Sequence, residues 1–275
     1  MVNNRLFRIC FLLCLTIQFI SAAPQLVQPR RLVDAHTAGI LGRGQYDLEC
    51  RIHPAGNQRY GSGVTIGIDV GITDRLTIGL SYGGEGVVGR GPDIKPHPQP
   101  GWLIKYRLFE EGFAMPGFAL GYDHQGHGGR ADTSQFFYDG YIYKSPGFFL
   151  AISKNFILLN VVQFGIHGSC NYSLENADDV RWPNFIAGID FGVNEELFLV
   201  MEYDFGFNCK DPRPDKKDVY ANPAEGYFNA GIRWAFSPSL YLEFDAHDIL
   251  ENRRTKNGDL VGWDRELRLI FFSEF

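Results

Sequence analysis

Apolar and polar positions alternate along most of this chain, and short polar turns interrupt the alternation at intervals. Residues 67–82, GIDVGITDRLTIGLSY, show the layout most clearly, with apolar residues at every second position on both sides of a turn. Such period-2 alternation around a short turn predicts a β-hairpin. The layout recurs at 188–203 and 231–246, and more loosely at 105–120 and 149–164. Repetition of one hairpin predicts a meander of consecutive antiparallel strands.

The alternating segments are roughly 9 to 11 residues long or longer, which is the length that a tilted strand needs to cross a bilayer. Short turns alternate strictly with long polar connections that are rich in Gly, Pro, Asn and Asp. The short turns are Thr73-Asp74, Glu110-Glu111, Lys154-Asn155, Asn194-Glu195 and Ser237-Pro238. The predicted strands are 45–53, 62–72, 76–85, 101–109, 113–123, 137–153 (interrupted by Pro146), 156–172, 183–193, 197–207, 227–236, 240–249 and 266–275.

An even number of strands with this alternation puts every short turn at one end of the molecule and every long loop at the other. Outer-membrane barrels have this asymmetry, with short periplasmic turns and long extracellular loops. The pattern predicts an all-β fold, a closed antiparallel up-and-down transmembrane β-barrel of about 12 strands. A soluble β-sandwich would show the same alternation. Aromatic residues near strand ends, such as Tyr82, Trp102 and Trp182, favour the membrane barrel.

The first 23 residues have the composition of a secretory signal peptide. Arg5 and Arg8 precede an apolar run at 9–20, and small residues at 21–23 offer a cleavage site. We expect residues 24–44 to form an irregular periplasmic lead-in and residues 45–275 to form the barrel. Removal of residues 1–23 takes away two of the 26 Lys and Arg and none of the 32 Asp and Glu, which leaves a formal charge of −8. This acidic balance argues against nucleic-acid binding.

The final residues, RELRLIFFSEF, resemble the terminal strand of bacterial outer-membrane proteins. The matching positions are Leu267, Leu269, Phe271 and Phe275, whereas Ser273 departs from the pattern. The resemblance implies recognition by the barrel-assembly machinery and insertion into the lipid of a Gram-negative outer membrane. TAGILGRGQYDLECRI and GIDVGITDRLTIGLSYGG are also similar to uncharacterised bacterial barrels, including exopolysaccharide-associated barrels of the YjbH type. No functional residues carry over from that second likeness.

Charged residues occupy positions between the apolar ones, and we expect them to line the lumen. The basic members could form an anion path and the acidic members a cation path. Alternatively, the two signs could neutralise one another in a plugged lumen, because twelve strands lie between the filled eight-stranded barrels and the open porins. The candidate lumen residues are Asp69, Lys105, Arg107, Asp190, Glu202, Asp204, Arg233, Glu243, Asp245 and Arg268.

Asp123, His124 and His127 form the most suggestive chemical cluster, in GYDHQGHGG. Two histidines at i and i+3 with an acid could ligate a metal, but an exposed flexible loop is the simpler interpretation. We therefore assign no metal and no cofactor. A lipid hydrolase would need a serine within reach of a histidine, and no serine follows His124 at the spacing found in outer-membrane phospholipases. A bridge between Cys170 and Cys209 stays open, although unpaired thiols are favoured by the odd cysteine count after cleavage.

The sequence thus predicts a non-enzymatic outer-membrane barrel, either a narrow channel or a transport or envelope-associated barrel for small polar or saccharide solutes. The alternative is a closed structural or adhesive barrel that binds partners through its extracellular loops. A third, less favoured hypothesis is an outer-membrane lipid hydrolase near His124 and His127.

Overall fold

The computed structural model describes residues 28–54, 62–88, 94–131, 140–158, 162–175, 180–209 and 225–275. Within these ranges no helix is long and apolar enough to span a membrane. The described strands are β1 Gln45–His53, β2 Gly63–Thr73, β3 Leu76–Glu85, β4 Lys95–Pro96, β5 Gly101–Phe109, β6 Gly117–Asp123, β7 His127–Ala131, β8 Gly140–Tyr143, β9 Gly147–Leu158, β10 Val162–Tyr172, β11 Asn184–Gly192, β12 Leu197–Asp204, β13 Tyr227–Ser237, β14 Leu240–His247 and β15 Asp264–Glu274.

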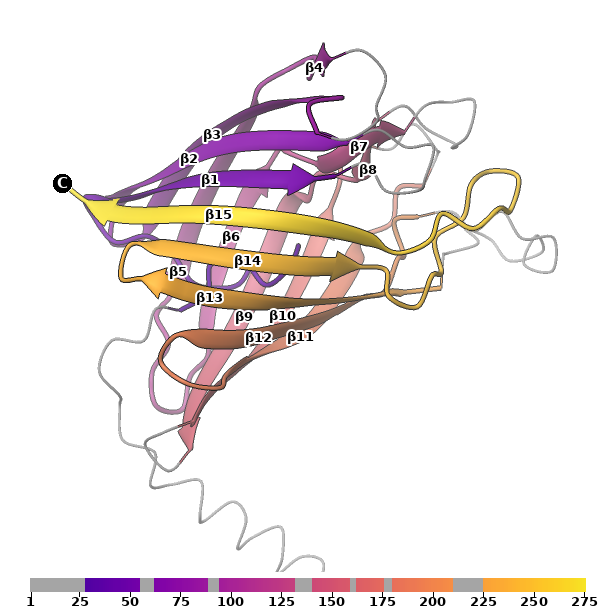
Figure 1. Cartoon of the computed structure of the whole chain (residues 1–275). Helices are drawn as coiled ribbons and strands as arrows, with labels where there is room; N and C mark the ends of the chain where they lie inside the picture. Colours follow the sequence, from indigo (N-terminus) through magenta and orange to yellow (C-terminus); the bar gives the residue numbers. More distant parts are fainter. Residues whose placement is uncertain are drawn as a thin grey trace, which may run out of the picture.

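Twelve of these strands form one antiparallel sheet that closes on itself (Figure 1). Each long strand pairs with the next along the chain, and β1 also pairs with β15, where Arg51 lies opposite Arg268. The short strand β4 extends the rim beside β3, while β7 and β8 form a separate two-stranded sheet. The closed twelve-stranded barrel predicted from the alternation is therefore confirmed.

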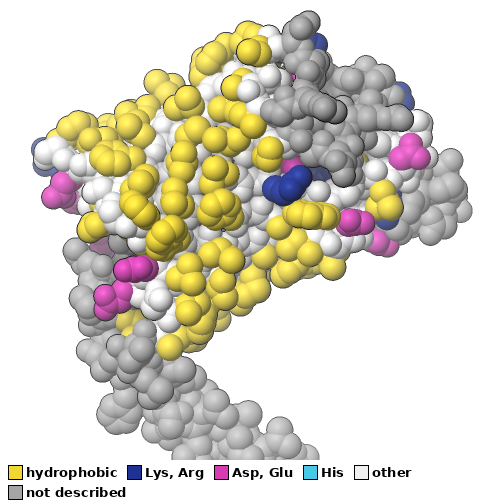
Figure 2. Space-filling view, in the orientation of Figure 1, with side chains coloured by type: hydrophobic (Ala, Val, Ile, Leu, Met, Phe, Trp, Pro, Cys, Tyr) yellow, Lys and Arg dark blue, Asp and Glu magenta, His cyan; other side chains and the backbone are white. Residues whose placement is uncertain are grey.

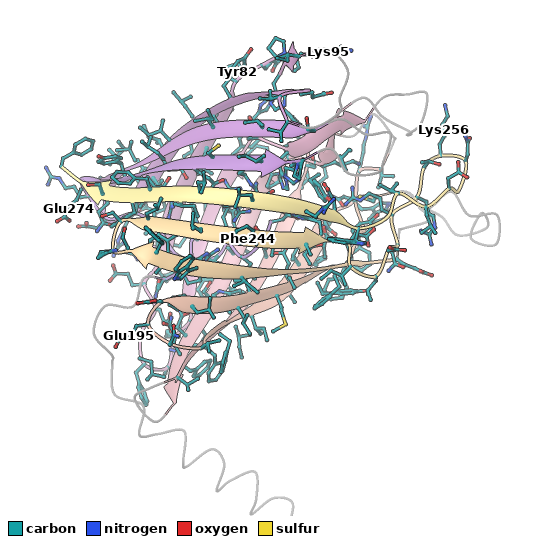
Figure 3. The ribbon with its side chains drawn as sticks, viewed as in Figure 1. Tyr82, Lys95, Glu195, Phe244, Lys256 and Glu274 are labelled. Carbon is teal, nitrogen blue, oxygen red and sulfur yellow. The ribbon has the colours of Figure 1, made fainter. Side chains whose placement is uncertain are left out.

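The short and long connections gather at opposite ends of the barrel, as the alternation predicted. Connections at 74–75, 110–116, 193–196 and 238–239 and the last residues of β9 lie at the end that also holds the C-terminal residue (Figure 1). The last residues of β1, β3, β6, β10, β12 and β14, from which the longer connections start, lie at the other end. We call these the short-turn end and the long-loop end. In Figure 3, Glu195 and Glu274 mark the short-turn end and Lys256 marks the long-loop end.

Parts of the predicted strand boundaries are wrong. Residues 137–153 do not form one strand, because residues 144–146 separate β8 from β9 and Gly147 adopts a positive φ of 68°. β8 instead pairs with β7, and β7 lies in the connection predicted between the strands 113–123 and 137–153. Lys154 and Asn155 lie within β9 rather than in a turn. Asn155 faces the barrel interior, where its side chain donates to Glu111 at 2.6 Å, and Lys154 lies 3.2 Å from the same carboxylate.

Apolar side chains face outward and polar side chains face inward. On β11, Ile189 is 42% exposed whereas the adjacent Asp190 is 2% exposed. Ile232 on β13 and Phe244 on β14 are likewise exposed. Figure 2 shows the apolar band that these side chains form over the strands, and Figure 3 labels Phe244 within it. This partition is the reverse of a soluble sandwich and is the one that a hydrocarbon environment requires.

Residues 28–42 lie inside the barrel, where the sequence pattern had suggested an irregular lead-in (Figure 1, indigo). We call residues 28–42 the plug. Leu32 and Val33 are fully buried in it, and so is most of the surrounding segment. The predicted signal peptide at 1–23 lies outside the described residues. In the part of the chain that is described, Cys170 and Cys209 form no disulfide.

Candidate functional site

The plug enters and leaves the barrel at the short-turn end. Near its start, Gln28 Nε2 donates to a Glu111 carboxylate oxygen at 3.0 Å. Just after its end, the Arg43 amide donates to the Asp74 carboxylate at 3.1 Å. Glu111 and Asp74 both belong to short turns between barrel strands. The plug is therefore a loop with both of its ends at the same mouth of the barrel.

The plug reverses direction at its tip, deep in the lumen. Arg31 and His36 form an isolated antiparallel bridge, and the Leu32 amide donates to the Ala35 carbonyl at 2.9 Å. These contacts close a tight hairpin-like turn. Asp34 lies at this tip and points toward the long-loop end, where it contacts histidines of the barrel wall.

Basic side chains of the wall supply hydrogen-bond donors to the carbonyl groups of the plug. Lys105 Nζ donates to the carbonyl of residue 30 at 3.0 Å. Arg233 donates to the carbonyl of residue 31 at 3.1 Å, and Arg268 donates to that of residue 33 at 2.6 Å. A loop without a regular ladder must satisfy its backbone groups in some other way. Here the wall satisfies them with charged side chains.

Oxygen atoms of the wall accept from the amide groups of the plug. The Glu202 carboxylate accepts from the amides of residues 34 and 35, each at 3.0 Å. Ser153 Oγ accepts from the amide of residue 38 at 2.8 Å, and Thr77 Oγ1 accepts from that of residue 41 at 3.3 Å. The wall therefore forms hydrogen bonds with the backbone of the plug along both of its arms.

The two plug arginines pair with carboxylates of the wall. Arg30 is in direct contact with Asp47 and lies 3.4 Å from Asp69, while Arg31 lies 2.8 Å from Asp123. Asp47 and Asp123 are almost completely buried. Removal of one partner of a buried pair costs about 3–5 kcal/mol, because it leaves an uncompensated charge. These pairs therefore fix the plug in one position.

His36 adds a stacked contact on the returning arm of the plug. Its ring lies 3.9 Å from the Phe149 ring with an interplanar angle of 9°, and its Nε2 lies 2.9 Å from Asp123. Burial, followed by the Arg31 guanidinium, lowers the pKa of His36 from 6.5 to about 3, although Asp123 opposes the shift. The imidazole is therefore neutral at neutral pH.

Glycines of the wall leave room for the plug. A Cβ atom at Gly71 would lie 1.9 Å from the Gly42 carbonyl oxygen and 2.8 Å from that of Leu41. A Cβ atom at Gly188 would lie 2.5 Å from Leu32 Cδ1. The wall can approach the plug this closely only where it has no side chain.

The structure places all of the predicted lumen residues on the inner face of the barrel. Asp69, Lys105, Glu202, Arg233 and Arg268 contact the plug. The others pair with wall groups: Glu243 with Arg233 and Arg268, Asp190 with His167, Asp204 with Asn184, Arg107 with Glu110, and Asp245 at 3.9 Å from Arg268. Charges of both signs thus neutralise one another, as in the plugged-lumen alternative. Their part in a solute path stays a prediction.

Cavities of very different size lie on the two sides of the plug tip. A cavity of about 770 Å³ extends from the short-turn end, and its lining includes Arg30, Asp69, Lys105 and Arg107. A cavity of about 50 Å³ adjoins the tip on the other side, with Asp34 in its lining. The wide cavity is therefore separated from the long-loop end by the tip of the plug.

The predicted loop cluster of Asp123, His124 and His127 does not form one site. Asp123 faces inward and binds the plug. His124 stacks against Trp102, with ring centroids 6.4 Å apart. His127 lies in β7, where its Nδ1 is 3.1 Å from His53 Nε2. The i, i+3 spacing therefore does not produce shared ligation.

A hydrogen-bonded Ser-His-Asp chain is present elsewhere in the lumen. Ser153 Oγ lies 2.8 Å from His167 Nδ1, and His167 Nε2 lies 2.5 Å from Asp190 Oδ1. These are the residue types of a hydrolase triad. However, all of them are buried and face the lumen, and Ser153 Oγ already accepts the amide of Ala38. This hydrogen-bonded Ser-His-Asp group therefore anchors the plug and presents no nucleophile to lipid.

The sequence pattern missed the plug and the histidines at the long-loop end. The plug is short and has no strand or helix period, so periodicity cannot detect it. Its one signal is the adjacent Arg30-Arg31 pair in an acidic chain. His53 and His247 continue the inward positions of Arg51 and Asp245, and the period-2 pattern could have placed them in the lumen.

No family model matches the chain, and no curated protein matches it, so the likeness to YjbH-type barrels stays a prediction. Among solved structures, the chain is similar to the KdgM porin, with a TM-score of 0.41 and 8% identity over 84% of this chain and 99% of that one. It is similar to the NanC porin, with a TM-score of 0.43 and 9% identity over 83% and 99%. A COG4313 outer membrane channel from Pseudomonas putida F1 has a TM-score of 0.42 and 12% identity over 88% and 100%. These likenesses carry no argument about function, and the fold assignment rests on the closed strand order of the chain itself.

Proposed function

We propose that this protein is an outer-membrane β-barrel that conducts small polar or saccharide solutes and that the plug closes it at rest. The observation that carries the proposal is a segment of the chain held inside the lumen by ion pairs and hydrogen bonds. The segment is bound along both arms and at its tip, and both of its ends lie at one mouth. It can therefore leave through that mouth without unfolding the wall.

The outward apolar band supports placement in a bilayer. Exposed Ile, Leu, Phe and Trp side chains cover the strands, while the charged residues lie inside. Outer-membrane barrels have this band together with short periplasmic turns. The apolar residues of the terminal strand, Leu267, Leu269 and Phe271, belong to it, which supports assembly by the barrel-assembly machinery. We accordingly place the short-turn end in the periplasm.

The polar character of the plug contacts supports a channel that can open. Water can replace ion pairs and hydrogen bonds at a modest net cost, whereas it cannot replace apolar packing. With the plug withdrawn, the wall would present charges of both signs to a water-filled lumen. The 770 Å³ cavity at the short-turn end would then continue toward the long loops. We infer that mixed charge suits polar or saccharide solutes better than ions of one sign.

A second candidate is a permanently closed barrel that binds partners through its long loops. Its support is the same plug, which the wall binds along both arms and at the tip. The two candidates differ in one measurable property, which is conductance after the plug contacts are weakened.

Single-channel recording in planar bilayers tests the proposal. The purified full-length protein is compared with the variant Arg30→Glu/Arg31→Glu, which turns the pairs with Asp47, Asp69 and Asp123 into like-charge contacts. We expect rare openings in the wild type and at least tenfold more frequent openings in the variant. Arg75→Glu, an exposed short-turn position, is the matched control and should behave as the wild type.

Heat-modifiable gel mobility first establishes that each protein is a folded barrel. Equal, frequent conductance in the wild type and the double variant would show that the plug does not close the lumen. Silence of both folded proteins would favour the closed structural barrel instead.

A further inference from the structure

Three histidines and one glutamate converge at the long-loop end of the lumen, beside the tip of the plug. His53 ends β1, His127 begins β7, His247 ends β14 and Glu266 lies near the start of β15. All of them are buried. They come from segments far apart in the sequence, so only the closed barrel brings them together. Asp34 of the plug contacts His127 and His247, but none of the lumen charge pairs described above involves these three histidines.

The donor atoms of this cluster are close enough to share one ion. One donor atom from each of His53, His247 and Glu266 lies within 4.8 Å of the other two. His53 Nε2 contacts Glu266 Oε2, and His247 Nε2 lies 3.6 Å from it. His127 Nδ1 lies 3.5 Å from Glu266 Oε2 and 3.1 Å from His53 Nε2. Tetrahedral ligands about 2.0–2.1 Å from Zn²⁺ are about 3.4 Å apart. The separations of 3.1, 3.5 and 3.6 Å suit a common ion, and the closer contact between His53 and Glu266 would have to widen around it.

Each histidine presents its other ring nitrogen to a carboxylate outside the cluster. His53 Nδ1 lies 3.3 Å from Asp264, His127 Nε2 lies 2.8 Å from Asp34, and His247 Nδ1 lies 3.2 Å from Asp34. A carboxylate accepts hydrogen bonds, so the proton of neutral His127 and of neutral His247 sits on that outer nitrogen. The inner nitrogen of each of these two rings is then a bare lone pair, whereas His53 lies between two carboxylates, Asp264 and Glu266. Metal-binding histidines are oriented by carboxylates in this way.

Glu266 is held with one oxygen free for the cluster. Its Oε1 accepts from Arg51 at 2.9 Å and from Arg268 at 2.9 Å. Its Oε2 faces the histidines, where it contacts His53 Nε2 and lies 3.6 Å from His247 Nε2. His247 Nε2 has no hydrogen-bond partner within normal distance, although His247 is 0% exposed. Buried polar atoms are almost always satisfied, so this nitrogen, which is aimed at the carboxylate from 3.6 Å, points to a missing ligand beside Glu266.

We propose that His53, His127, His247 and Glu266 bind one divalent transition-metal ion of the Zn²⁺ type at the tip of the plug. Three imidazole nitrogens and one carboxylate oxygen form a donor set that Zn²⁺ accepts in tetrahedral geometry. Asp34 belongs to the plug and orients two of the ligands, so the ion would also fix the plug tip to the wall. The site does not depend on whether the barrel conducts.

The competing state is a metal-free cluster in which a protonated His53 bonds to both Asp264 and Glu266. Metal content separates the two states. The full-length protein is folded in detergent with excess Zn²⁺, freed of unbound metal and analysed by inductively coupled plasma mass spectrometry. We expect about one Zn²⁺ per chain, which falls at least tenfold in His247→Ala and in Glu266→Gln. His124→Ala, which alters a nearby outward-facing histidine, should retain the wild-type content.

Co²⁺ in place of Zn²⁺ gives a second readout that needs only the wild-type protein. The four-ligand site predicts the intense visible absorption of tetrahedral Co²⁺, lost on addition of one equivalent of Zn²⁺. Asp34→Asn should retain the site but weaken it about 10–100-fold, because it removes the carboxylate that orients two ligands. A folded wild-type barrel that retains no Zn²⁺ and gives no tetrahedral Co²⁺ spectrum overturns the proposal. Retention of Zn²⁺ by folded His247→Ala at the wild-type level overturns it as well.

Discussion

Individual charged side chains of the barrel wall form hydrogen bonds with the backbone of the plug, and so do more than line the lumen. Glu202 accepts two plug amides, and Arg268 donates to a plug carbonyl while it also contacts Glu243. Hydrogen bonds to charged groups contribute about 1.5–3 kcal/mol each, more than neutral ones. A charged residue that the sequence pattern assigns to an ion path can therefore instead bind the backbone of the plug.

At this scale, His36 makes the plug sensitive to pH. Its pKa is lowered from 6.5 to about 3 by burial and then by Arg31, so the unfolded or withdrawn plug binds the proton more readily. The stabilisation is complete above about pH 6.5 and is lost as the pH falls toward 3, by about 1.4 kcal/mol per pH unit. We expect trypsin cleavage after Arg31 to report plug withdrawal. Its rate should rise in mildly acidic solution relative to that of a variant that lacks the titrating ring, a comparison that cancels the pH dependence of trypsin itself.

His36→Gln is the matched variant for this prediction. Glutamine can still donate to Asp123 but does not titrate. The ratio of the wild-type to the variant cleavage rate should rise between pH 6.5 and pH 4, which removes the contribution of every other titrating group. Parallel pH profiles for the two proteins would contradict a role for His36.

At the scale of the element, the plug and strand β2 are fitted to each other. The plug carries no period of its own, and its conformation comes from the wall. Gly71 on β2 meets only the backbone of plug residues 41 and 42, whereas inward-facing Gly67 on the same strand meets only β3, at 3.4 Å or more. These two glycines therefore separate the effect of plug contact from that of strand position.

Gly71→Ala should push the returning arm of the plug away from the wall while the barrel stays folded. Overpacking of a tight contact costs about 1–3 kcal/mol, so trypsin cleavage after Arg31 should accelerate by roughly fivefold or more. Gly67→Ala should leave the rate near that of the wild type, because its Cβ would meet Ser81 at an ordinary distance. The measurement is limited proteolysis followed by mass spectrometry. Equal rates for the two variants would mean that the close approach at Gly71 does not position the plug.

At the scale of the whole molecule, the barrel has the reverse of the apolar and polar distribution of a soluble protein. Its apolar residues are outside, its charged residues are inside, and a segment of its own chain fills the centre. A filled centre lets a barrel of this size carry many buried charges without leaving them unpaired. The described residues do not cover the exposed apolar band, which therefore needs lipid or detergent around it.

Ile232→Arg tests the lipid contact of the band. Ile232 lies outward in the middle of β13, and a charge at the bilayer midplane of a barrel costs about 2–4 kcal/mol. We expect a loss of that order in the free energy of unfolding, measured by urea titration in lipid vesicles with gel mobility as the readout. Leu250→Arg, in the exposed connection after β14, should cost less than about 1 kcal/mol. Similar losses at both positions would argue against a bilayer around the band.

The sequence by itself determined which residues face outward and which face inward. Side chains alternate along a strand with a period of two, so the order of Ile189 and Asp190 fixes their opposite faces once a strand forms. The same local rule gave the strand number, the closure and the separation of short turns from long loops. It failed at Lys154-Asn155, because two adjacent polar residues at the end of a strand have the same sequence pattern as a turn.

The tertiary structure alone decided what fills the lumen. Arg31 meets Asp123, Asp34 meets Glu202, and Ser153 meets the amide of Ala38, each across dozens of residues of chain. The convergence of His53, His127, His247 and Glu266 has the same origin. Such contacts depend on how a closed wall positions distant strands around a non-periodic segment, and no local alternation encodes that geometry.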